Sequence, residues 1–120
     1  MTHDDVNRWL EAYVAAWRGY DRDAIGALFA ADARYRYHPW DEPVTGREAI
    51  VDSWLDSPDD PAAWDAGYRA WAVEGDRAVA TGTSRYDDAR GTRIYHNAFL
   101  ISFDDDGRCR EFSELYVQQR

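Results

Sequence analysis

Two segments near the end of the chain alternate between apolar and polar residues and predict a pair of β-strands. They cover residues 92–103 and 107–118, and Asp104-Asp105-Asp106-Gly107 between them is a strong turn signal. One face of the pair carries Tyr95, Asn97, Phe99, Ile101 and Phe103, then Phe112, Glu114 and Tyr116. A buried amide or carboxylate without a hydrogen bond costs about 1–3 kcal/mol. Asn97 and Glu114 on this face therefore predict a pocket with polar anchors.

The N-terminal third predicts two helices. Thr2 and Asp5 form a capping box, and Gly19 ends the first helix. Its apolar positions have helical spacing, at Val6, Trp9, Leu10, Tyr13, Val14 and Trp17. A second, shorter helix is expected from about residue 21 to residues 31–32, with Ala24, Ile25, Leu28 and Phe29 on one face.

A strand over residues 33–38 is expected next, closed by Pro39. Thr45-Gly46-Arg47-Glu48 resembles a second capping box and predicts a third helix, which carries Ile50, Val51, Trp54 and Leu55. The Pro-rich loop at residues 57–61 stops this helix. Two further strands, over about 64–73 and 78–86, complete an antiparallel meander with the last pair. Three helices followed by a long antiparallel sheet predict an α+β fold in one domain over residues 1–120.

The composition of the chain restricts the classes of molecule that it is expected to bind. The net charge is −9 and the arginines are scattered, which argues against nucleic acid and against anionic membrane surfaces. Aromatic residues make up 15% of the chain, and large rings line cavities well. We therefore expect a small molecule as the partner.

The single cysteine, Cys109, allows no internal disulfide. No apolar run approaches the ~20 residues that span a bilayer, and the N-terminus does not resemble a signal peptide, so a cytoplasmic location is expected. Three scattered histidines have no ligand spacing, and we expect no metal and no other cofactor.

Several short motifs carry a resemblance to a known family. They are Asp21-Arg22-Asp23-Ala24-Ile25, Leu28-Phe29-Ala30-Ala31-Asp32-Ala33, His38-Pro39, Gly46-Arg47-Glu48-Ala49-Ile50 and Phe103-Asp104-Asp105-Asp106-Gly107-Arg108. Their order resembles the nuclear transport factor 2-like superfamily, which includes ketosteroid isomerases and SnoaL-like polyketide-cyclase-like proteins. The resemblance implies a cone in which three N-terminal helices pack on a strongly curved, mostly antiparallel sheet around an open pocket. Such a fold hosts many unrelated activities.

The resemblance also implies which residues face the pocket. They are Ala80, Gly82, Ser84 and Tyr86, then Tyr95, Asn97 and Phe99, then Phe112, Glu114 and Tyr116. Ala80, Gly82 and Ser84 are small and are expected to leave room for a ligand.

Three positions match the catalytic residues of ketosteroid isomerases. Tyr13 matches the tyrosine that donates to the substrate oxygen, and His38 falls where that family has its aspartate base. Phe99 falls where the family has its second oxyanion donor, which argues against a steroid isomerase with a complete oxyanion hole. No set of residues at the pocket positions matches the Asp-Arg-Asp constellation of the epoxide hydrolase branch.

The candidate catalytic residues are His38, Glu114, Tyr13 and Asn97. His38 titrates near neutrality and suits acid–base work, or it is a strand-end histidine bonded to a carbonyl. Glu114 acts as a base, orients His38 or binds a ligand hydroxyl, or it is a structural carboxylate; without a cationic partner its pKa is expected to be raised. The candidate substrate-binding residues are Trp9, Trp17, Trp40, Trp54, Ser84, Tyr86, Tyr95, Phe99, Phe112 and Tyr116, with Trp40 expected to cover the pocket mouth.

Two functions remain open at this point. One is a cofactor-independent enzyme of isomerase, dehydratase or cyclase type on a small, largely apolar substrate with one or two oxygens. The other is a non-catalytic module that binds a ligand or mediates assembly. The opposite face of the sheet carries Ile94, Leu100, Leu115 and Val117, which predicts a homodimer through that face.

Overall fold

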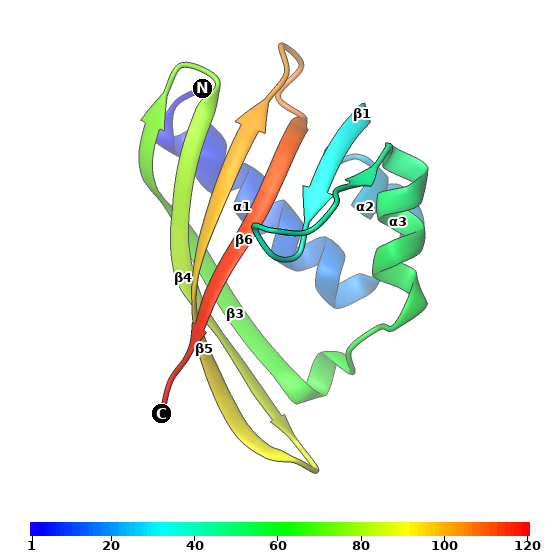
Figure 1. Cartoon of the computed structure of the whole chain (residues 1–120), viewed down its shortest axis with the longest axis vertical. Helices are drawn as coiled ribbons and strands as arrows, with labels where there is room; N and C mark the ends of the chain where they lie inside the picture. Colours follow the sequence, from blue (N-terminus) through cyan, green and yellow to red (C-terminus); the bar gives the residue numbers. More distant parts are fainter.

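All three α-helices lie on one side of a curved, six-stranded sheet (Figure 1). The computed structural model describes all of residues 1–120. The helices are α1 (His3–Gly19), α2 (Arg22–Gly26) and α3 (Arg47–Asp56), with a short 3-10 turn, η1 (Pro61–Ala63). The strands are β1 (Phe29–Arg36), β2 (Val44–Thr45), β3 (Trp64–Glu74), β4 (Arg77–Asp88), β5 (Gly91–Phe103) and β6 (Cys109–Gln118).

The strands are ordered β2-β1-β6-β5-β4-β3, and only β1 and β6 run parallel. Helix α1 packs on β3, and α3 packs on β1. This arrangement confirms the predicted α+β cone. It also confirms the β5–β6 hairpin, in which Asn97 lies opposite Tyr116 and Phe99 lies opposite Glu114.

Helix α1 has the predicted N-terminal cap. The Thr2 hydroxyl accepts from the Asp5 N–H, and the Asp5 carboxylate accepts from the Thr2 N–H. Gly19 is the last helical residue, but the left-handed residue that closes the helix is Tyr20, with φ 48°. The N–H of Tyr20 bonds to the Ala16 carbonyl, so the turn is closed without a glycine in the left-handed position.

The predicted length of the second helix was wrong. Helix α2 ends at Gly26, and Phe29 already begins β1, four residues before the predicted strand start. Phe29 is fully buried, and its backbone pairs with Cys109 of β6. Burial against the sheet therefore outweighs the helical spacing of the apolar residues.

The second capping box was also wrong. The residue at the N-cap of α3 is Gly46, which has φ 95° and makes no side-chain cap. Thr45 belongs instead to β2, where it pairs with Arg34 of β1. A left-handed backbone at the cap position favours glycine, and this explains the residue found there.

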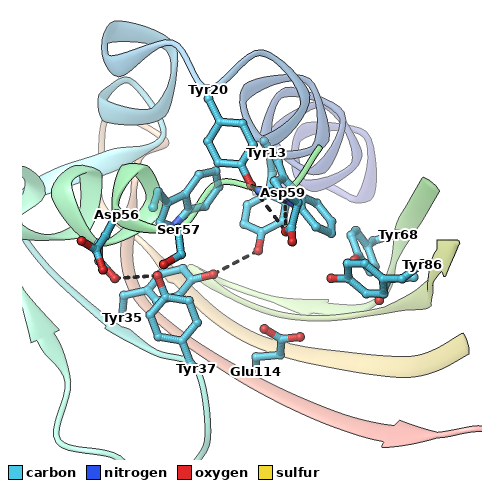
Figure 2. Close-up of a pocket in the computed structure, with 14 residues that line it drawn as sticks. Tyr13, Tyr20, Tyr35, Tyr37, Asp56, Ser57, Asp59, Tyr68, Tyr86 and Glu114 are labelled. Carbon is cyan, nitrogen blue, oxygen red and sulfur yellow. Dashed lines mark hydrogen bonds between the residues drawn. The ribbon is translucent and has the colours of Figure 1, made fainter. Parts of the chain in front are cut away.

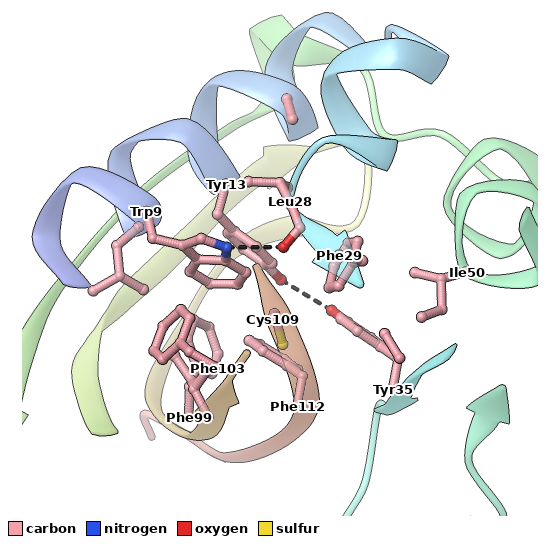
Figure 3. Close-up of a cluster of buried hydrophobic side chains, with 14 of the residues drawn as sticks. Trp9, Tyr13, Leu28, Phe29, Tyr35, Ile50, Phe99, Phe103, Cys109 and Phe112 are labelled. Carbon is pink, nitrogen blue, oxygen red and sulfur yellow. Dashed lines mark hydrogen bonds between the residues drawn. The ribbon is translucent and has the colours of Figure 1, made fainter. Parts of the chain in front are cut away.

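The core is an aromatic cluster between α1, β1 and the centre of the sheet (Figure 3). Phe112 of β6 stacks on Tyr35, with ring centroids 4.6 Å apart, and on Tyr13, at 5.6 Å. Trp9 donates its indole N–H to the Leu28 carbonyl at 3.0 Å. These contacts fix the two tyrosine rings on which the cavity described below depends.

Small residues on β4 do not leave room for a ligand in the way the sequence suggested. Ala80 is fully buried in the core. A methyl group on Gly82 would lie 2.0 Å from the Gly67 carbonyl oxygen and 2.7 Å from the Tyr68 ring. Gly82 therefore allows β3 to approach β4 closely, and only Ser84 of the three small residues faces the cavity.

The close approach at Gly82 makes a stability prediction. We expect Gly82→Ala to destabilise the fold by about 2–3 kcal/mol or more, because backbone atoms must move to admit the methyl group. Gly67→Ala is the matched control, since a methyl group there meets nothing within 4 Å. Urea denaturation of both variants checks this, and a Gly82→Ala variant as stable as Gly67→Ala would contradict it.

The outer face of the sheet carries exposed apolar side chains. Leu100, Leu115 and Val117 are 49%, 38% and 71% exposed. His96 lies near them, and its Nε2 is 2.8 Å from Oε1 of Gln119. No helix in the chain has both the length and the apolar character needed to cross a membrane.

We propose that two copies of the chain associate through this outer face, because neighbouring exposed apolar side chains call for a cover. Light scattering at micromolar concentration should give the mass of a dimer. Val117→Glu should shift the mass to that of a monomer with the circular dichroism spectrum unchanged, since Val117 is mostly exposed in the single chain. A wild-type protein that is monomeric under these conditions would contradict the proposal.

Candidate active site

A cavity of about 330 Å³ opens between α1, α3 and the concave face of the sheet (Figure 2). Every apolar residue on its wall is aromatic, and the remaining lining residues are three serines and three carboxylates. The lining residues are Tyr13, Trp17, Tyr20, Tyr35, Tyr37, Ser53, Trp54, Asp56, Ser57, Asp59, Tyr68, Ser84, Tyr86 and Glu114. None of them is basic.

Glu114 of β6 is the inward carboxylate of this cavity. Its Oε1 accepts a hydrogen bond from the Asn97 amide at 3.0 Å, and Asn97 in turn accepts from the Ser84 hydroxyl at 2.8 Å. This chain of bonds leaves Oε2 of Glu114 without a protein partner. The carboxylate is thereby held in one orientation with one free oxygen.

Burial raises the pKa of Glu114 to about 7. The Asn97 hydrogen bond and the nearby His38 act in the opposite direction but do not cancel it. Glu114 forms no salt bridge, whereas Asp52 and Asp88 each pair with an arginine. A desolvated carboxylate without a cationic partner favours its protonated form.

Tyr13 and Tyr35 place two hydroxyls opposite Glu114. Their oxygens are 3.0 Å apart, and both side chains are buried, at 6% and 2% exposed. Burial raises the pKa of each well above the usual range, so both hydroxyls stay protonated. One proton is used in their mutual hydrogen bond, and the other is left to donate to a ligand oxygen. Figure 2 shows these hydroxyls and the Glu114 carboxylate facing the same space.

A further donor lines the wall formed by α3. The indole N–H of Trp54 is buried and has no hydrogen-bond partner. Nearby, the Tyr37 hydroxyl and the Ser53 hydroxyl bond to each other at 2.7 Å. Because the Trp54 nitrogen atom itself is buried, this N–H is an unsatisfied donor inside the wall and presents no surface to a ligand.

Asp59 marks the entrance of the cavity. Its Oδ2 accepts from the Trp17 indole at 3.2 Å and from the Tyr20 hydroxyl at 3.5 Å. The Asp59 N–H donates back to the Tyr20 oxygen at 2.8 Å. These bonds tie the 57–60 loop to the end of α1.

His38 does not line this cavity. It lies in the bend after β1, where its Nδ1 is 2.9 Å from an Asp41 carboxylate oxygen and its Nε2 is 3.1 Å from the Tyr116 hydroxyl. Trp40 stacks on the His38 ring at 5.1 Å and is 80% exposed. Trp40 therefore does not cover the cavity mouth. With His38 and Tyr116 it borders a second hollow of about 540 Å³, whose lining also includes Asn97 and Glu114.

The structure divides the predicted site residues into four groups. Lining the cavity are Tyr13, Trp17, Trp54, Ser84, Tyr86 and Glu114. Asn97 lies one hydrogen bond behind Glu114. Packed in the core and away from the cavity are Trp9, Phe99 and Phe112. Outside the cavity are His38, Trp40, Tyr95 and Tyr116.

Phe99 cannot donate a hydrogen bond, and it packs on Tyr68 with ring centroids 4.5 Å apart. The second hydroxyl beside Tyr13 comes instead from Tyr35 on β1, which the sequence reasoning did not select. Alternation of Ala33, Tyr35 and Tyr37 with Arg34 and Arg36 was the signal for it. Tyr20 and Asp59 were also missed, and they lie outside any regular strand or long helix, where periodicity carries no information.

No group of three or more histidine, cysteine, aspartate or glutamate side chains is placed to hold a metal ion. Cys109 is buried in the core, and its Sγ lies 3.3 Å from the Glu111 carbonyl oxygen. The cavity itself presents one carboxyl group with a pKa of about 7, two further carboxylates, three serine hydroxyls and protonated phenols.

The fold and cavity define a protein of the nuclear transport factor 2-like superfamily. Residues 10–112 match the SnoaL-like domain, and the chain belongs to that family. A comparison with curated proteins finds no match.

Solved structures share the fold at low sequence identity. An NTF-2-like protein of unknown function from Burkholderia xenovorans LB400 is 18% identical, with a TM-score of 0.73 over 98% of this chain and 86% of that chain. An LEH-like epoxide hydrolase from M. tuberculosis is 14% identical, with a TM-score of 0.71 over 96% of this chain and 84% of that one. A hypothetical protein with a ketosteroid isomerase-like fold from Catenulispora acidiphila DSM 44928, solved in complex with trimethylamine, is 23% identical, with a TM-score of 0.69 over 91% of this chain and 85% of that one.

Proposed function

We propose that this protein is an acid–base enzyme of isomerase, dehydratase or cyclase type that needs no metal or organic cofactor. Its substrate is a small, largely apolar molecule that carries a carbonyl or hydroxyl oxygen. One observation carries the proposal: a carboxylate with a pKa of about 7 shares an aromatic cavity with a pair of buried tyrosine hydroxyls. A titratable group and a donor that face one space are the elements of proton transfer at carbon.

Glu114 is the proton acceptor in this proposal. With a pKa of about 7, roughly half of its side chains are ionised at neutral pH. The free Oε2 takes a proton from a carbon next to the substrate carbonyl, and the C–H electron pair moves into an enolate. Protonated Glu114 then returns the proton to another carbon, which completes an isomerisation. Alternatively it protonates an oxygen on the β-carbon, whose C–O bond breaks as the enolate electrons form a C=C bond, and loss of water completes an elimination.

The Tyr13–Tyr35 pair stabilises the enolate oxygen. Its spare proton is directed to an oxygen in the cavity, and a hydrogen bond to a developing anion in a water-poor site is stronger than one to a neutral carbonyl. Asn97 is a positioning residue, because it touches Glu114 and holds the carboxylate in place. His38 does not line the aromatic cavity and is given no proton-transfer step there, and its charge lowers the pKa of Glu114.

The cavity argues against an epoxide hydrolase of the Asp-Arg-Asp type, because no arginine lines it. The likeness to the M. tuberculosis enzyme is at 14% identity and supports the fold alone. The trimethylamine complex of the Catenulispora acidiphila protein supports a small molecule as occupant of this fold.

A non-catalytic binding protein is the second candidate. The observation in its favour is Phe99, a buried ring that cannot donate to a ligand oxygen. A binder needs only walls and an anchor, and the aromatic lining with Asn97 and Glu114 would supply them.

Hydrogen–deuterium exchange of small ketones separates the two candidates without knowledge of the natural substrate. Cyclopentanone and cyclohexanone are incubated with the protein in D₂O, and loss of the α-proton signal is followed by NMR. We expect exchange above the buffer rate, increasing with pH around a midpoint of about 7 because Glu114 must be ionised. Glu114→Gln should lower the protein-catalysed rate about 100-fold or more, and Tyr13→Phe about tenfold or more.

Glu111→Gln is the matched control, because it makes the same change on the same strand at a residue that does not line the cavity. It should leave the rate unchanged, and His38→Ala should stay within about threefold of wild type. Exchange at the buffer rate with both ketones, or a Glu114→Gln variant as active as wild type, would favour the binding protein.

A further inference from the structure

The cavity combines aromatic faces with unpaired negative charge. All of its apolar lining residues are tyrosine or tryptophan, and Asp56, Asp59 and Glu114 face it with no basic residue in the lining. Arg90 and Arg93 line an adjoining hollow that also includes Asp59 and Glu114. None of these three carboxylates takes part in a salt bridge, although 14 arginines are present in the chain. A cleft with carboxylates of one sign and low-dielectric walls concentrates negative potential and attracts cations.

Aromatic rings and a carboxylate at the entrance of the cavity form a candidate cation-binding site. Trp17 and Tyr86 lie with ring centroids 6.2 Å apart, and Tyr20 joins them through its bond to Asp59. Both side-chain bonds to Asp59 go to Oδ2, which leaves Oδ1 free. Burial raises the pKa of Tyr86, and the negative charge of Asp59 raises it further, so the Asp59 carboxylate lies close enough to affect Tyr86.

Arginine side chains already contact aromatic rings in and next to this part of the cavity. The Arg93 guanidinium lies 5.4 Å from the centroid of the Tyr86 ring. Arg18 lies 4.2 Å from the Trp64 ring, which stacks on Trp17 at 3.7 Å. Cation–π contacts are therefore in use around this part of the cavity.

The interior of the cavity offers a hydrogen-bond donor to a ligand oxygen. Tyr13 and Tyr35 are buried, and their hydroxyl pair has one proton left to donate. A ligand that satisfies both ends has a cationic group at the entrance and an oxygen in the interior.

We propose that the substrate is a small organic cation, a tertiary or quaternary amine with an oxygen function, whose ammonium group binds between Trp17, Tyr20 and Tyr86 against Asp59. The assignment rests on the proposed function in one respect, that the occupant of the cavity is the substrate. An alkylated ammonium group suits this cation-binding site because it is weakly hydrated and presents an apolar surface to the aromatic rings.

Two probes of the same shape test the charge directly. Choline and its neutral isostere 3,3-dimethylbutan-1-ol differ only in the central nitrogen or carbon of the bulky group. Isothermal titration calorimetry with the full chain should show choline binding at least about tenfold more tightly than the alcohol, as expected for a partly desolvated cation on aromatic faces.

Substitutions at Asp59 and Tyr86 test the position of the cation-binding site. Asp59→Asn should weaken choline about threefold or more and leave the alcohol unchanged. Asp32→Asn is the matched control, because Asp32 is an exposed residue of β1 that lines no cavity, and it should change neither probe. Tyr86→Leu should weaken choline, whereas Tyr86→Phe, which keeps the ring, should bind it as the wild type does.

Equal affinity for the two probes, no binding of either at millimolar concentration, or equal effects of Asp59→Asn and Asp32→Asn would overturn the proposal. These outcomes are distinguishable from failure of the acid–base function. Binding is measured without turnover, so loss of ketone exchange would leave the choline preference intact, and a missing preference would leave the exchange rates intact.

Discussion

The cavity depends on the burial of one carboxylate without a cation to neutralise it. Glu114 is desolvated among tyrosines and held by an amide instead of an arginine, so its pKa rises to about 7. Such a group lowers the free energy of unfolding at any pH above its ordinary pKa, because the unfolded chain solvates the ionised carboxylate better than the folded chain does. The surrounding structure must therefore supply the stability that this site removes.

The aromatic core provides that stability and also places the donors. Phe112, two residues before Glu114, stacks on both Tyr13 and Tyr35 and so sets the position of their hydroxyls. Each aromatic pair of this kind contributes about 0.5–1.5 kcal/mol beyond the burial of its area. The parallel pairing of β1 with β6 then brings Tyr35 next to the strand that carries Glu114. Core packing and site geometry are consequently the same set of contacts.

Sequence periodicity predicted the parts of the site that lie on regular elements. Alternation along β5 and β6 identified Asn97 and Glu114, and helical spacing along α1 identified Tyr13 and Trp17. It failed where tertiary contacts decide the structure. Phe29 joined a strand because β6 pairs with it. Asp59 lies in a loop, and His38 turns away to Asp41 and Tyr116 in a bend whose direction no local pattern records.

The ionisation of Glu114 is the property on which the account depends most directly. Carbon-13 NMR of the side-chain carboxyl groups, followed from pH 4 to pH 9, measures it without a substrate, and Glu114→Gln assigns the resonance by its absence. We expect a titration midpoint of about 7. A midpoint near the ordinary value of about 4.3 would show that the carboxylate is well solvated, and it would contradict the role given to Glu114.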